Sequence, residues 1–434
     1  MKRFFALCLL FAMLLGITGC GGSASGENAD DPQRYPMTGD PIDSARVDLM
    51  SGIVKGNITP DPDTDAGTAA AADFALQLAG FSAEGGKNLL LSPLSVLCAL
   101  AMTANGADNE TLAQMEAVFG MSVQALNEYL CWYVESLPQS ENCHLSLANA
   151  IWINETARFT PNRDFLQFNA DYYGADIYAA PFDSATCADI NDWVNNKTNG
   201  MIPAILDRVP PEALLYLVNA LAFEARWQEQ YESYQVREDS FTKADGTEQT
   251  VEFMYSMEHL YLEDENATGF IKMYEDNAYA FVALLPNEGV SLEEYLASLT
   301  GEELSALIDG AQQAMVSAAI PKFETEYSIE LSEVLKNMGM ADAFDPDRAD
   351  FSAMGFSTEG NLFISRVLHK TFISVGELGT KAGAATVIEV PDATGALPPD
   401  EIKEVTLDRP FVYLIIDCET GLPFFIGILA DAKN

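Results

Sequence analysis

The sequence has few of the residues that build metal centres and enzyme active sites. Only three of its 434 residues are histidine, His144, His259 and His369, and they lie too far apart for a histidine-rich metal motif. The chain contains no HExxH, CxxC, GxSxG or GxxxxGK[ST] motif. We therefore expect that the protein binds no metal and no cofactor and that it has no active site of the classes these motifs mark.

Basic residues are also scarce. There are 23 Lys and Arg against 65 Asp and Glu, which gives a formal net charge of -42. Such a field repels phosphate backbones, which argues against nucleic-acid binding. The acidity suits solubility or a salty or host-exposed habitat, and the sequence does not decide between these. Apolar residues make up 48% of the chain, enough for a large buried core.

The amino terminus has the pattern of an export signal. Lys2 and Arg3 precede an apolar run over residues 4–18, too short for a comfortable membrane span but typical of a signal peptide. The segment Ile17-Thr18-Gly19-Cys20 resembles a bacterial lipobox. We therefore predict a signal peptide over residues 1–19, a lipidated Cys20 and a membrane-anchored or shed surface protein. Ordinary secretion is the alternative.

The rest of the chain divides into two parts. Residues 20–67 are rich in Gly, Ser, Asn, Asp and Pro, which predicts a flexible tether. Residues 68–434 contain no repeat or low-complexity stretch, which indicates one folded domain.

Five cysteines remain after Cys8 and Cys20, an odd number that cannot be fully paired. Cys98 and Cys418 lie in apolar runs and are interpreted as small core residues. A disulfide between Cys131 and Cys143 stays open.

Hydrophobic periodicity predicts a mixed structure. Helices are expected over residues 69–81, 93–105, 291–299 and 328–338. Strands are expected over residues 149–153, 215–223, 279–285, 315–320, 411–417 and 423–429. This order indicates an α+β protein with large sheets.

Residues 379–390 have an unusual alternation. Read as a strand, one face carries only small or apolar side chains: Thr380, Ala382, Ala384, Thr386, Ile388 and Val390. Both charges of the segment, Lys381 and Glu389, lie on the other face. This is the pattern of a strand with one buried and one solvated face. A plain surface loop and a permanent strand are the alternatives, and Ala and Gly are poor strand formers.

Several segments resemble the serpin family, in the family's order and over the whole chain after residue 68. They are NLLLSPLS at 88–95, DWVNNKTNG at 192–200, LVNALAF at 217–223 with Trp227, IPKF at 320–323, VLHKTF at 367–372, ELGTKAGAAT at 377–386, DRPF at 408–411 and Phe425-Ile426-Gly427. The resemblance implies three β-sheets, about nine helices and an exposed reactive-centre loop. It also implies a monomer that is not an enzyme but traps a serine protease covalently.

The resemblance assigns roles to particular residues. Ser92, Ser95, Asn219 and His369 would form the hydrogen-bonded network that governs opening of the central sheet, with Trp227 near the top of the sheet. The hinge would comprise Glu377, Gly379, Thr380, Lys381, Ala382, Gly383, Ala384, Ala385 and Thr386. Simpler interpretations are a helix cap for Ser92 and ordinary core packing for His369 and Trp227.

The family spacing from Glu377 places the cleaved bond at Ala393-Thr394. Pro391 then lies near the end of an inserted strand, where proline is tolerated. Val390, Thr394 and Ala396 remain alternatives, because the segment up to Pro410 is longer than usual. An alanine before the bond suits elastase-like or subtilisin-like proteases, and trapping of cysteine proteases stays open.

Three functions are compatible with these residues. The first is a suicide-type protease inhibitor, the second a non-inhibitory binding protein of the same fold, and the third an unrelated surface enzyme. The absence of bulky or charged side chains on the inward face from Thr380 to Thr386 favours the first.

Overall fold

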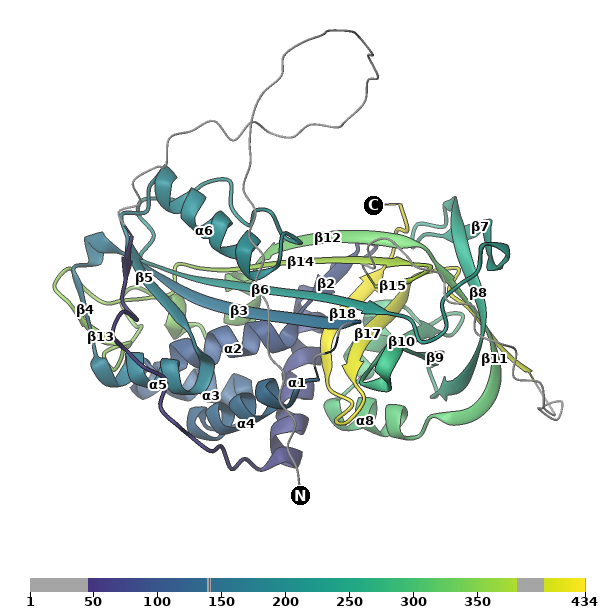
Figure 1. The fold of residues 1–434 in the computed structure, drawn as a ribbon, viewed down its shortest axis with the longest axis horizontal. Helices are drawn as coiled ribbons and strands as arrows, with labels where there is room; N and C mark the ends of the chain where they lie inside the picture. The colour runs from purple at the N-terminus through teal and green to yellow at the C-terminus, as the bar shows by residue number, and fades with distance from the viewer. Residues whose placement is uncertain (1–45, 139, 141, 381–401, 434) are drawn as a thin grey trace, which may run out of the picture. The chain divides into compact units, whose positions relative to one another are not determined.

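A computed structural model describes residues 46–138, 140, 142–380 and 402–433, which belong to one compact unit spanning residues 43–434. In this part of the chain the strands form sheets of seven, nine and two strands, accompanied by nine α-helices (Figure 1). The predicted α+β class with three sheets is confirmed. The predicted signal peptide and Cys20 lie outside the described residues.

The seven-stranded sheet runs along the centre of this unit. Its order is β1 (Val47–Asp48), β5 (Asp176–Ala180), β3 (Cys143–Asn154), β6 (Leu215–Arg226), β15 (Gly379–Thr380), β14 (Arg366–Gly376) and β12 (Phe323–Glu330). Strands β3 and β6 are antiparallel, whereas β6 and β14 are parallel.

The nine-stranded sheet contains most of the strands of the carboxyl-terminal half of the chain. Its order is β16 (Ile402–Thr406), β11 (Gln312–Pro321), β8 (Glu248–Glu263), β9 (Ala267–Met273), β10 (Tyr279–Pro286), β17 (Phe411–Asp417), β18 (Pro423–Leu429) and β2 (Leu89–Leu91), with β7 (Val236–Thr242) paired to β8. The small third sheet joins β4 (Phe159–Pro161) to β13 (Gly355–Ser357).

Nine α-helices accompany the sheets in the described part of the chain, and some of them cover the two faces of the central sheet (Figure 1). The nine helices are α1 (Thr64–Ser82), α2 (Pro93–Ala104), α3 (Asn109–Phe119), α4 (Val123–Ser136), α5 (Arg163–Tyr173), α6 (Ser184–Lys197), α7 (Leu292–Ser298), α8 (Gly301–Asp309) and α9 (Ser332–Met338). Figure 1 shows α6 on one face of the sheet and α1 to α5 on the other. Among the described residues, no helix is both long and apolar enough to cross a membrane.

The hydrophobic core consists of two clusters, and strand β6 contributes side chains to both of them. Tyr216 and Val218 pack with α6, while Leu217 and Leu221 pack into the larger cluster on the opposite face. A strand buried on both faces needs a near-continuous apolar run, which is what residues 215–223 supply.

The predicted tether is wrong for residues 46–67. Strand β1 pairs with β5, and Leu49, Met50 and Ile53 pack against the larger core. Helix α1 begins at Thr64, where the Asp63 side chain accepts a capping hydrogen bond from the backbone N–H of Ala66. A few apolar residues are enough to dock a polar segment on a body that is already folded, which composition alone does not reveal.

The structure answers one open question about the cysteines and corrects one interpretation. Cys131 and Cys143 are both buried and free, so the disulfide considered from the sequence is not formed. Cys98 is buried as predicted, but Cys418 is exposed because it lies just beyond the end of β17, at the turn to β18.

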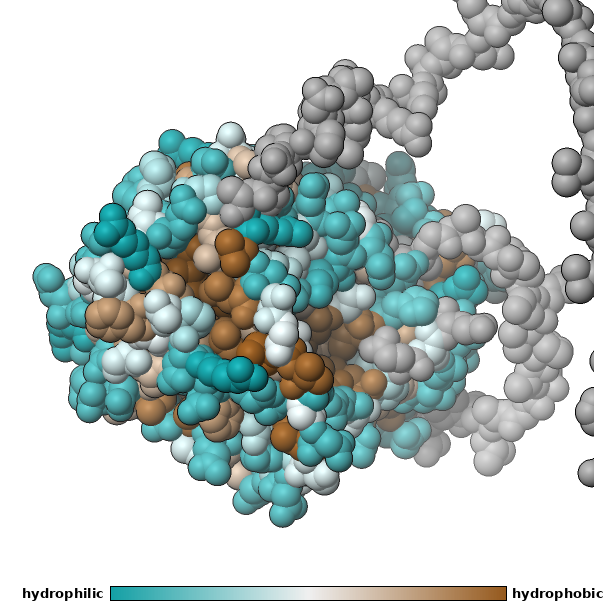
Figure 2. All heavy atoms as spheres, turned by 60° about the vertical axis from the view of Figure 1, so that its left-hand side comes forward, coloured by the Kyte–Doolittle hydropathy of each residue, from teal (hydrophilic) through white to brown (hydrophobic). Residues whose placement is uncertain are grey.

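Hydrophobic residues gather in a band on the face that Figure 2 brings forward, bordered by hydrophilic ones. Large exposed apolar side chains of the described residues at this end of the central sheet include Val47, Phe168 and Phe356. They come from β1, α5 and β13, at the end of the sheet opposite β15 (Figure 1).

Candidate functional site: the hinge and the sheet-opening network

Strands β14 and β15 form a tight hairpin at one end of the central sheet. Val375 pairs with Thr380 and Gly376 with Gly379, while the other edge of β15 pairs with Ala225 and Arg226 of β6. The hairpin therefore places the first hinge residues between two long strands. Residues 381–386 of the predicted hinge and the predicted bond Ala393-Thr394 lie outside the described residues.

Gly379 occupies a position that only glycine fits. Its φ of +149° lies in a region that residues with a side chain rarely adopt, and a Cβ atom would stand 2.1 Å from the carbonyl oxygen of Ala225. The close approach of β15 to β6 thus depends on the missing side chain.

The segment that follows β6 donates hydrogen bonds to the backbone carbonyls of the hinge turn. The backbone N–H of Trp227 donates to the Leu378 carbonyl at 3.0 Å, and its indole Nε1–H donates to the Gly376 carbonyl at 2.8 Å. The backbone N–H of Tyr231 donates to the Glu377 carbonyl at 3.0 Å. Trp227 thus lies against the hinge, and it is not part of the network formed by the other four predicted residues.

Thr380 is the last described residue of the hinge and is buried. Its hydroxyl lies 2.5 Å from the Tyr274 hydroxyl, and the Tyr274 ring stacks on Trp227 with centroids 4.5 Å apart. Burial raises the pKa of Tyr274 well above its ordinary value, so the phenol stays neutral. The sequence analysis missed Tyr274, since no local pattern connects it to Thr380.

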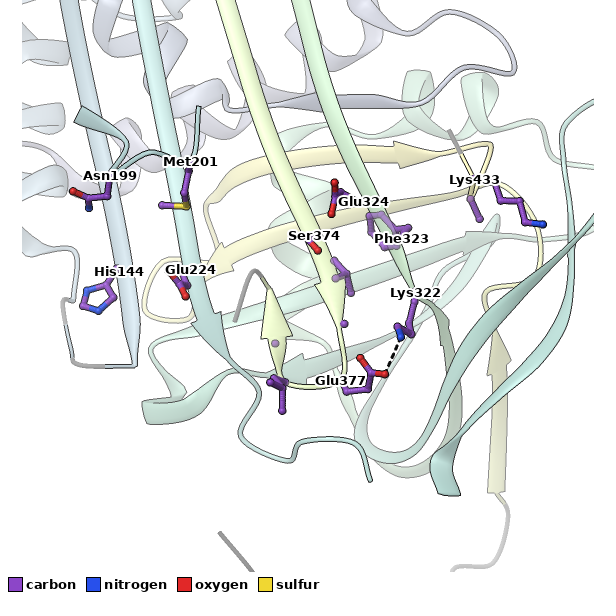
Figure 3. Close-up of a pocket in the computed structure, with 15 residues that line it drawn as sticks. His144, Asn199, Met201, Glu224, Lys322, Phe323, Glu324, Ser374, Glu377 and Lys433 are labelled. Carbon is purple, nitrogen blue, oxygen red and sulfur yellow. Dashed lines mark hydrogen bonds and ion pairs between the residues drawn. The ribbon is translucent and has the colours of Figure 1, made fainter. Parts of the chain in front are cut away.

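An ion pair holds the outer side of the turn. Lys322 Nζ lies 2.8 Å from Glu377 Oε1 and 2.9 Å from Glu252 Oε2. Burial disfavours the charged form of Glu377, but the hydrogen bond and the charge of Lys322 outweigh it, so the pKa of Glu377 is lowered. Figure 3 shows Lys322 directed at Glu377, and both residues line a cavity.

This cavity has a volume of about 850 Å³ and is lined by residues of β6, β12 and β14, including Glu224, Phe323 and Ser374 (Figure 3). Below it, residues 366–370 of β14 pair directly with residues 216–220 of β6. Above it, both strands pair with β15. Strands β6 and β14 are therefore separated between these two regions, where a longer β15 would lie between them.

The second predicted cluster lies where β6 and β14 are still paired. Ser95 Oγ donates to Asn219 Oδ1 at 2.9 Å, and His369 Nδ1 lies 2.6 Å from the same oxygen. Asn219 Nδ2 donates to Asn149 Oδ1 at 3.0 Å. The network thus joins α2, β3, β6 and β14 at the point where the sheet would have to open.

The contact of Ser92 fixes the state of His369. The backbone N–H of Ser92 donates to His369 Nε2 at 3.0 Å, so Nε2 carries no proton and Nδ1–H donates to Asn219. Burial lowers the pKa of His369 from 6.5 to about 3. Ser92 is the N-cap residue of α2, as the simpler interpretation expected, but its hydroxyl makes no capping hydrogen bond.

Asn219 and Ala225 lie six positions apart on β6, or roughly 20 Å along the strand. The two clusters are therefore joined by the same pair of strands. The structure brings Ser92, Ser95, Asn219 and His369 together at one position, and Trp227, Glu377, Gly379 and Thr380 at the other.

Comparisons with known proteins agree with this architecture. Residues 69–432 match the family described as "Serpin (serine protease inhibitor)". The chain is 32% identical to Serpin B10 of Bos taurus over 390 residues, covering 82% of this chain and 96% of that protein.

The structure resembles that of the thermophilic serpin Tengpin in two states. In the native state, with 50% identity, the TM-score is 0.85 and the match covers 89% of this chain and 99% of that one. In the latent state, also at 50% identity, the TM-score is 0.75, covering 88% and 100%. A three-sheet fold with a hinge hairpin between two parallel central strands defines a serpin-type scaffold. The chain belongs to the serpin family.

Proposed function

We propose that the protein is a suicide-type inhibitor of serine proteases. The observation that carries this proposal is the position of Gly379 and Thr380, paired on both sides between β6 and β14. A hairpin that has already turned into the sheet can be lengthened residue by residue without crossing another strand. The small, uncharged inward side chains from Thr380 to Thr386 suit such an extension.

The mechanism begins with the protease treating the loop as substrate. The serine of the protease attacks the carbonyl carbon of the residue before the scissile bond. The peptide bond breaks, the carboxyl-terminal part of the chain leaves with a new amino group, and the amino-terminal part of the loop stays bound to the serine as an acyl-enzyme. Residues of about 380–391 then enter the central sheet as one strand and carry the attached protease along. Distortion of the protease prevents deacylation, because its oxyanion hole and triad require accurate geometry.

We propose that the cleaved bond is Ala393-Thr394, as the family spacing counted from Glu377 implies. A small apolar residue before the bond suits the narrow specificity pocket of elastase-like or subtilisin-like enzymes. Arg and Lys are absent between Val387 and Ile402, which argues against a trypsin-like target.

Incubation with pancreatic elastase and with subtilisin tests the proposal. On denaturing gels we expect a covalent complex with one of them and a released carboxyl-terminal peptide that begins near Thr394. Cleavage without complex, together with raised thermal stability, would mean insertion without trapping and would favour the non-inhibitory binding protein.

We further propose that the protein is exported and anchored to a membrane through a lipid on Cys20. The support is the signal-like sequence of residues 1–20. Detergent phase partitioning of the full chain expressed in a bacterium tests this, since a Cys20→Ser variant should move from the detergent phase to the aqueous phase.

A further inference from the structure

A buried ion pair lies directly beneath the segment that holds the hinge. Lys272 of β9 donates to Glu258 Oε1 of β8 at 2.8 Å, and their side chains are only 2% and 11% exposed. Burying two charges carries a desolvation penalty, and apolar residues of similar size are often equally stable. Stability alone therefore does not account for these two residues, and their contacts indicate what else they do.

The ammonium group of Lys272 faces two aromatic rings. Nζ lies 4.5 Å from the ring centroid of Tyr231 and 5.5 Å from that of Trp227. A desolvated cation is strongly attracted to the face of an aromatic ring. The position of Lys272 therefore sets the position of both rings.

Glu258 holds the same segment through a second contact. Its Oε1 also accepts a hydrogen bond from Ser256 Oγ at 2.6 Å, and that hydroxyl lies 3.3 Å from the hydroxyl of Tyr231. Tyr231 is thus fixed at its ring by Lys272 and at its hydroxyl by the Glu258–Ser256 pair.

Trp227 and Tyr231 are the two residues that donate to the three successive hinge carbonyls, from Gly376 to Leu378. The contacts therefore form an unbroken series from Glu258 through Lys272 and the two aromatic residues to the turn of the hinge. Displacing the ion pair displaces the donors of the hinge.

We propose that Lys272 and Glu258 are positioning residues for loop insertion. They hold residues 227–231 so that the β14–β15 hairpin stays docked before cleavage, and insertion only has to extend a hairpin that is already formed. This inference rests on the proposed inhibitory function. Without the pair, the hairpin opens more often, insertion is slower, and more of the acyl-enzyme is hydrolysed before the protease is trapped.

The test compares the full-length protein with a Lys272→Met/Glu258→Leu double variant, which removes both charges and leaves neither unpaired. The control is Lys55→Gln/Glu135→Gln, which removes an exposed ion pair remote from the hinge, with side chains 47% and 54% exposed. A separate Lys272→Arg variant should retain the wild-type behaviour, because it keeps the cation. Glu258→Gln replaces the double variant if the latter does not fold.

Three quantities are measured in each protein. In the uncleaved protein, amide exchange of Trp227, Tyr231 and residues 378–380 should be about tenfold faster in the double variant. The number of inhibitor molecules hydrolysed without trapping, counted per trapped protease, should rise about threefold if loop insertion slows by the same factor relative to deacylation. The thermal midpoint of the uncleaved protein should change little, which separates positioning from general stability.

The outcomes separate the two claims. Wild-type exchange and wild-type consumption in the double variant would overturn the inference and leave the inhibitory function intact. Faster exchange in a protein that traps neither elastase nor subtilisin would support the docking role and count against the inhibitory function. Equal effects in the control variant would also overturn the inference.

Discussion

Asn219 and His369 face each other across the junction of two parallel strands, with 2.6 Å between Asn219 Oδ1 and His369 Nδ1. The pair is buried, and it lies where β6 and β14 remain joined below the hinge. Any strand that enters the sheet from above has to part these two residues. The protonation of His369 therefore bears directly on how easily the sheet opens.

Acidification should weaken this junction. The folded pKa of His369, about 3, lies below its ordinary 6.5, so between these values the unfolded chain binds more protons than the folded chain. Stability is complete above pH 6.5 and falls by about 1.4 kcal/mol per pH unit as the pH drops towards 3. Apparent urea midpoints of the wild type and His369→Gln measure this, and equal pH slopes in both would contradict it.

Gly379 and Gly376 offer a matched pair of substitutions in one turn. A Cβ on Gly379 would collide with the Ala225 carbonyl, whereas one on Gly376 meets no atom within 4 Å. Gly379→Ala should therefore expel the hinge from the sheet. If the protein is the inhibitor we propose, the variant becomes a substrate, with about a tenfold loss of trapped complex expected from a loss of roughly 1.4 kcal/mol. Gly376→Ala should stay within about twofold of the wild type. Densitometry of complex and cleaved bands checks this, and similar losses in both variants would refute it.

The contact between Tyr274 and Thr380 should contribute to hinge docking. A double-mutant cycle with Tyr274→Phe and Thr380→Val removes each hydroxyl singly and then both. We expect a coupling free energy of about 1 kcal/mol for the buried hydrogen bond. Amide exchange of residues 378–380 gives the local opening free energies, and strictly additive single effects would show that the hydroxyls do not interact.

The sequence predicted those elements whose pattern is local. Strands β17 and β18 match the expected residues 411–417 and 423–429, because each is a short apolar run bounded by turn residues. The expected helix over residues 328–338 begins only at Ser332, since residues 328–330 pair with β14. In that case a tertiary pairing, which no local pattern encodes, decided the conformation.

The candidate site also divides into residues that the sequence indicated and residues that only the structure revealed. Resemblance to the family indicated Trp227, Gly379 and the four residues of the network that includes Asn219, and the structure brings them together in two clusters. Tyr274 and Lys322 were not singled out, because their importance arises from contacts with hinge residues 106 and 55 positions away in the chain. Such long-range contacts leave no spacing for a sequence pattern to detect.

The central claim is that the cleaved loop becomes a strand of the central sheet. Adding about twelve residues to the sheet at about 1 kcal/mol each should stabilise the protein by roughly 10 kcal/mol. With an unfolding entropy of about 0.8 kcal/mol per kelvin for a unit of this size, that corresponds to a rise of roughly 12 °C in the thermal midpoint. The most direct measurement is thermal unfolding of the intact protein and of the same protein nicked between residues 390 and 397. We predict the large rise in the nicked protein; equal midpoints, with the severed segment still open to further proteolysis, would contradict the account.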